Sequence, residues 1–91
     1  MKFKTHTGEI VTGARLQDAL NRVAQAWADN AKDVRTEDRY ASHVAESEKD
    51  DYLREELDYA ESIRQGNIDC FTIWQRVNAH LTGECVAYLP E

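Results

Sequence analysis

The sequence predicts an α+β fold that is mainly helical and forms a single domain over residues 1–91. Three observations lead to this prediction. Short runs near the N-terminus alternate polar and apolar residues, longer stretches carry apolar residues at spacings of three and four, and the chain has only one Pro and four Gly. A chain of this length rarely supports two independent cores, and a composition that is 42% hydrophobic and 31% charged is typical of a folded protein.

Residues 1–13 predict a β-hairpin. Phe3 and Thr5 alternate with lysines, the letters HTGE supply a turn, and EIVT leads back along a second strand. Gly8 lies within that turn, and we expect it to adopt a positive φ because glycine has no Cβ to oppose it.

The following stretch predicts a first helix from Ala14 to about Lys32. Thr12 or Gly13 is expected to cap its start. Several alanines widen its apolar face and favour a helix intrinsically. The apolar stripe at helical spacing consists of Leu16, Leu20, Val23, Trp27, Ala31 and Val34.

Residues 37–65 predict a further helical region that is broken in the middle. No Gly or Pro lies within it, but the apolar residues of its two halves fall on faces that differ by ~100° at ~3.6 residues per turn. We therefore expect a break near Ser47, with one helix over 37–46 and a second over 48–65. A single bent helix is the alternative. The first face holds Tyr40, Ala41, Val44 and Ala45, and the second holds Tyr52, Leu53, Leu57, Ala60 and Ile63.

The C-terminal part predicts one more helix and a short strand. Gly66 and Asn67 end the preceding helix, Asp69 is expected to cap the next one, and Thr82–Gly83 end it. Residues 84–90 then contain β-favourable Val and Tyr and finish at a proline. We expect this strand to join the N-terminal hairpin in a small antiparallel sheet, because a two-stranded hairpin alone is marginally stable.

These patterns together predict three or four helices and a hairpin packed on one core. Each core position is an apolar residue on the inward face of its element. The expected core residues are Phe3, Ile10, Leu16, Leu20, Val23, Trp27, Leu53, Leu57, Ile63, Phe71, Trp74, Val77, Leu81 and Val86.

No motif in the sequence predicts catalysis, a metal site or a cofactor site. His6, His43 and His80 lie in no H-E-x-x-H or comparable spacing, and the two cysteines form no C-x-x-C pair. We expect Cys70 and Cys85 to be small buried hydrophobes, with a disulfide or a surface thiol as the alternative. The sequence also lacks a nucleophile motif, a phosphate-binding loop and a dinucleotide fingerprint, so a non-enzymatic protein is expected.

The negative charge is concentrated in one segment. The formal net charge is −6, whereas residues 37–61 contain ten acids and three bases, which gives −7. Direct binding of nucleic acid by this segment is disfavoured, because phosphates are bound through Lys and Arg. No apolar run approaches the ~18 residues of a membrane span, and the first residues do not resemble a signal peptide, so we expect a cytoplasmic protein.

Four acids of the predicted 48–65 helix fall on one face, opposite the stripe of Leu53, Leu57 and Ala60. They span ~15 Å and place a carboxylate every ~4–5 Å, which is of the same order as the ~3.4 Å phosphate interval along one DNA strand. Two tyrosines flank them, and aromatic side chains often anchor interfaces. The predicted partner-binding residues are Glu48, Asp51, Tyr52, Glu55, Asp58 and Tyr59.

Two function classes remain after these exclusions. The first is a protein-interaction module whose acidic helix docks on a basic surface of a partner protein and blocks a nucleic-acid site there. The second is a homo-oligomeric structural or regulatory module, such as a homodimer, whose acidic helix is merely solvated. In both classes we expect no cofactor, no direct nucleic-acid binding and no membrane association.

The combination of small size, acidity, a single domain and no catalytic motif is similar to that of phage and mobile-element inhibitors of the DNA-mimic type. Anti-restriction and anti-CRISPR proteins of this type are the examples. The similarity is one of composition. It implies an inhibitor whose partner is a nucleic-acid-binding protein.

Overall fold

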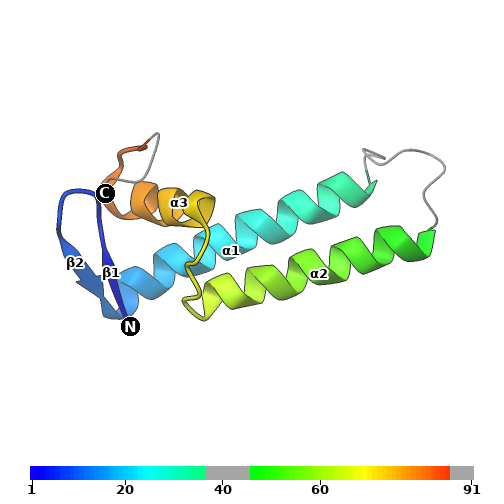
Figure 1. The fold of residues 1–91 in the computed structure, drawn as a ribbon, viewed down its shortest axis with the longest axis horizontal. Helices are drawn as coiled ribbons and strands as arrows, with labels where there is room; N and C mark the ends of the chain where they lie inside the picture. Colours follow the sequence, from blue (N-terminus) through cyan, green and yellow to red (C-terminus); the bar gives the residue numbers. More distant parts are fainter. Residues whose placement is uncertain (37–45, 87–91) are drawn as a thin grey trace.

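The computed structural model describes residues 1–36 and 46–86 and confirms a mainly helical α+β fold. A hairpin of two short strands precedes three helices (Figure 1). The elements are β1 (Lys2–Lys4), β2 (Ile10–Thr12), α1 (Gly13–Thr36), α2 (Glu46–Arg64) and α3 (Phe71–Thr82).

The hairpin pairs β1 with β2 in antiparallel register, with Phe3 opposite Val11. Its turn contains Gly8 at φ 90°, which confirms the predicted positive φ. Phe3 and Val11 are both buried, whereas Ile10 is 55% exposed. The prediction of Ile10 as a core residue is therefore wrong. Side chains alternate between the two faces of a strand, so burying Val11 turns Ile10 towards solvent.

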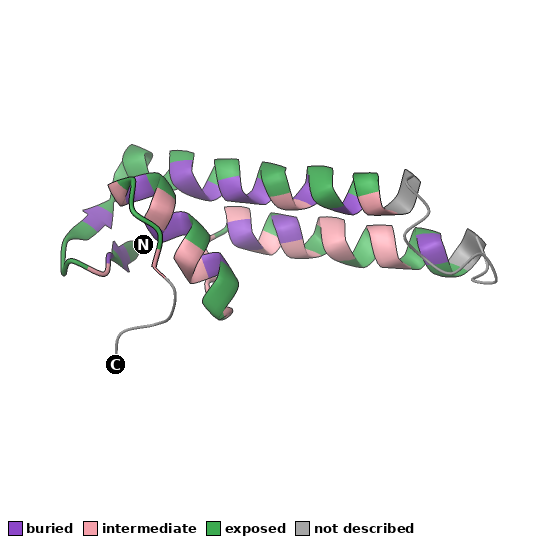
Figure 2. Cartoon of the chain, turned by 90° about the horizontal axis from the view of Figure 1, so that it is seen from above, coloured by how far each residue is buried: buried purple, intermediate pink, exposed green. Residues whose placement is uncertain are grey.

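Helices α1 and α2 form an antiparallel helical hairpin and lie side by side in both views (Figures 1 and 2). The interface between α1 and α2, which we call the α1–α2 seam, is rich in alanine. Ala24, Ala28 and Ala31 of α1 and Ala60 of α2 are all buried. Small side chains allow two helix backbones to approach closely. Helix α1 ends at Thr36, about one turn beyond the predicted end. The molecule is accordingly elongated, with extents of 47 × 25 × 19 Å.

Helix α3 packs against α1 and completes the core beside the hairpin (Figure 1). Its buried apolar residues are Ile73, Val77 and Leu81, at a regular spacing of four. Phe71 is 37% exposed, so its assignment to the core is wrong. The buried stripe begins two residues later than the sequence pattern predicts, because the first turn of α3 lies at the edge of the contact with α1 and the strands.

The start of α3 differs from the prediction as well. The N-cap residue is Cys70, in extended conformation with no side-chain cap hydrogen bond, and not Asp69. Asp69 lies one residue outside the helix, where its carboxylate is exposed. The end of the helix is as predicted, since Gly83 adopts φ 76° and its N–H donates to the Ala79 carbonyl.

The centre of the core is largely as predicted. Leu16, Leu20, Val23, Ile63 and Val77 are at most 1% exposed. Five other predicted residues are only half-buried: Trp27, Leu53, Leu57, Trp74 and Val86. Of these, Trp27, Leu57 and Trp74 pack against the core.

One buried polar side chain ties the hairpin turn to α3. Asn78 is 0% exposed, and its Oδ1 accepts a 2.9 Å hydrogen bond from the His6 backbone N–H. Its Nδ2 lies 2.9 Å from His6 Nδ1, while His6 Nε2 lies 2.8 Å from a carboxylate oxygen of Glu84. These contacts satisfy the buried amide and fasten three segments that are far apart in the sequence.

The C-terminal strand is not seen among the described residues. Residues 84–86 run beside α3 and are held by side chains: Gln75 Nε2 donates to the Val86 carbonyl, and Asn78 Nδ2 donates to the Glu84 carbonyl at 3.3 Å. The sheet therefore has two strands in the described part of the chain. The remainder of the predicted strand, from residue 87, lies outside it.

The predicted helix over 37–46 also lies almost entirely outside the described residues. Helix α2 begins at Glu46 and ends at Arg64, in close agreement with the predicted helix over 48–65. The break near Ser47 stays a prediction, because it concerns how α2 joins the residues before it.

Candidate functional site

The outer face of α2 carries the predicted acidic row. Glu48, Asp51, Glu55 and Asp58 are all exposed, and the helix that bears them is continuous from Glu46 to Arg64. The opposite side of α2 packs on α1 (Figure 2). The structure thus brings the four predicted carboxylates together on one solvent-facing helix surface, which we call the acidic face.

Two further acids extend the acidic face. Asp50 and Glu61 are exposed, which raises the exposed carboxylates of α2 to six among its described side chains. Arg54 is the exposed base on this helix, and its guanidinium pairs with Asp51. Glu61 also pairs with Arg64 of the same helix. Six acids against these two arginines leave a charge of −4, and exposed pairs of this kind contribute little stability.

Glu56 belongs to the interior side of α2, although it lies next to the row in the sequence. It is half-buried, and its Oε2 accepts a 2.6 Å hydrogen bond from Trp27 Nε1. The sequence analysis missed this pair. The available signal was Trp27 itself, because a tryptophan that is buried against a helix needs an acceptor for its indole N–H.

The two predicted tyrosine anchors are half-buried. Tyr59 packs edge-on against Trp27 with ring centroids 5.1 Å apart, so much of its ring belongs to the α1–α2 seam. Burial, and then the neighbouring Cys70 side chain, raise the pKa of Tyr59 to about 12. Tyr52 lies one turn from Glu48 and Glu55 at the border of the acidic face.

The two cysteines differ from their predicted burial. Cys85 is exposed and Cys70 is half-buried, and both are free thiols. The backbone N–H groups of Ile73 and Thr72, at the start of α3, favour the thiolate and lower the pKa of Cys70, with a further contribution from the Tyr59 hydroxyl. The assignment of Cys85 as a buried hydrophobe is wrong, because the chain leaves the core after Gly83.

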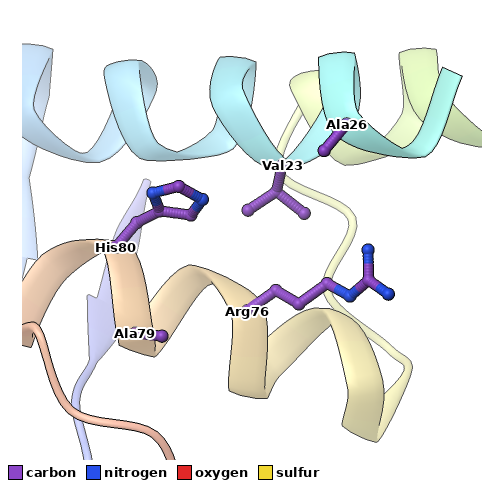
Figure 3. A pocket seen from close by; sticks show the side chains of 5 residues that line it. All are labelled: Val23, Ala26, Arg76, Ala79 and His80. Carbon is purple, nitrogen blue, oxygen red and sulfur yellow. The ribbon is translucent and has the colours of Figure 1, made fainter. Parts of the chain in front are cut away.

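A second feature lies between α1 and α3. Val23 and Ala26 of α1 and Ala79 of α3 line a hollow of about 370 Å³, into which the side chains of Arg76 and His80 project (Figure 3). We call this hollow the basic groove. Sequence analysis did not predict it, because its residues come from two helices whose packing is a tertiary property.

No group of three His, Cys, Asp or Glu side chains among the described residues is placed to hold a metal ion, and no described helix is long and apolar enough to cross a membrane. Comparison with protein families, curated proteins and solved structures finds no match to this chain.

Proposed function

We propose that this protein is a non-enzymatic interaction module that docks the acidic face of α2 on a basic surface of a partner protein and blocks a nucleic-acid site there. The observation that supports the proposal is the exposure of Glu48, Asp51, Glu55 and Asp58 along one continuous helix. A partner that binds the phosphates of DNA or RNA has the lysines and arginines that such a row complements.

The spacing of the acidic face supports a partner of this kind. The four carboxylates occupy about three turns of α2, which is ~15 Å of helix axis. A straight rod of negative charge at this density resembles one edge of a nucleic-acid backbone more closely than a scattered acidic surface does. The row is supported from behind, since α2 is packed along α1 through buried residues such as Ala60 and Ile63.

The acidic face also carries an energetic cost that solubility alone does not require. Like charges three or four residues apart destabilise a helix by ~0.2–0.5 kcal/mol for each pair. Along this face, Arg54 pairs with Asp51, and Glu61 pairs with Arg64. A binding role accounts for this concentration of charge on one helix.

The experiment compares two quadruple variants with the parent protein as baits in bacterial lysate. In the first, which we call the row variant, Gln replaces each of the four acids Glu48, Asp51, Glu55 and Asp58. In the second, the control variant, the same number of exposed acids is removed elsewhere: Glu9→Gln, Asp18→Asn, Asp29→Asn and Asp69→Asn. Both variants change the net charge from −6 to −2. Both also break exposed ion pairs, namely Arg54–Asp51 in the first and Arg15–Glu9 and Arg22–Asp18 in the second.

The proposal predicts that the parent and the control variant capture the same nucleic-acid-binding protein and that the row variant does not. The row variant should melt no lower than the parent, because Gln keeps the helix propensity and removes repulsion. Equal capture by both variants would refute docking through the acidic face. Recovery of only the bait itself, as an oligomer, would favour the homo-oligomeric alternative.

A further inference from the structure

We draw no further inference here: the strongest candidate, the basic groove between α1 and α3, is an apolar hollow with one exposed arginine, and nothing among the residues that the structure describes shows what covers it.

Discussion

Asn78 is the residue on which the packing of the hairpin turn depends. It is fully buried, and its amide is satisfied by His6 and by the Glu84 carbonyl. Among the buried side-chain atoms of the described residues, none lacks a hydrogen-bond partner. Every buried polar group of this network therefore has a partner, and removing one member lowers stability because the others are left without a hydrogen bond.

Replacing Asn78 by Ala should lower the free energy of unfolding by about 1–3 kcal/mol, because the His6 N–H loses its acceptor in a partly buried place. Urea denaturation of parent and variant gives this difference. Asn21→Ala is the matched control, since Asn21 is exposed on α1, and it should change stability by no more than ~0.5 kcal/mol. Equal losses in the two variants would mean that the buried network has no special importance.

Tyr59 makes stability depend on alkaline pH. Its pKa is raised from 10.0 to about 12, first by burial and then by Cys70, so the folded state holds the phenol proton more tightly than the unfolded chain. Below pH 10.0 the phenol is protonated in both states. As the pH rises from 10.0 through about 12, only the unfolded chain gains by ionising, and stability is lost.

We therefore expect Tyr59→Phe to flatten the fall in unfolding free energy between pH 10.0 and about 12. Denaturant titrations at several pH values measure the slope for parent and variant, and the difference between the two slopes isolates Tyr59 from the other ionisable groups. An identical slope for both proteins would contradict the raised pKa.

At the level of elements, Gly83 sets the end of α3. It adopts φ 76° and donates its N–H to the Ala79 carbonyl, and a Cβ at this position would meet no atom within 4 Å. A side chain at this position therefore lowers stability through the unfavourable backbone conformation and not through a steric clash. The end of α3 fixes where residues 84–86 leave the helix, and thereby where Glu84 meets His6.

Gly83→Ala should cost about 1 kcal/mol of stability, whereas Gly83→Asn should cost less, because Asn tolerates the left-handed region. Thermal or urea unfolding of the two variants measures the order. If Ala were tolerated as well as Asn, the left-handed cap would not be the reason for a glycine at this position.

The elements were predictable from sequence to the extent that each depends on local pattern. The hairpin, the long α1, the bounds of α2 and the glycine at the end of α3 all follow from periodicity and turn residues. The sequence did not predict which of two neighbouring apolar residues is buried, as Ile10 and Phe71 show. That depends on the other element against which a strand or helix packs. The same holds for Glu56, whose role is set by Trp27 on another helix.

Of the two candidate surfaces, one was predictable from sequence and the other was not. The acidic row was predictable because four acids at helical spacing lie on a single helix, and their exposure follows from the apolar residues on the other side. The basic groove needs the contact between α1 and α3, and Arg76 and His80 are two of several bases until that contact is known. A surface formed by one helix can be predicted from its sequence, whereas a surface formed by two helices depends on how they pack.

The whole molecule separates two charged surfaces. The acidic face lies on α2, and the basic groove lies between α1 and α3. The α1–α2 hairpin gives the molecule its elongated shape (Figure 1). The proposed function uses the acidic face, through which α2 would bind a basic protein.

Competition with nucleic acid tests that claim most directly. A labelled duplex is bound to the partner protein identified by capture, and its release is followed by fluorescence anisotropy as the parent, the row variant or the charge-matched control is added. We expect the parent and the control to displace the duplex and the row variant to fail. Displacement should weaken as salt is raised, because exposed charges are screened over ~10 Å at ~0.1 M. Binding of the parent while the duplex stays bound, or displacement by the row variant equal to that by the parent, would contradict it.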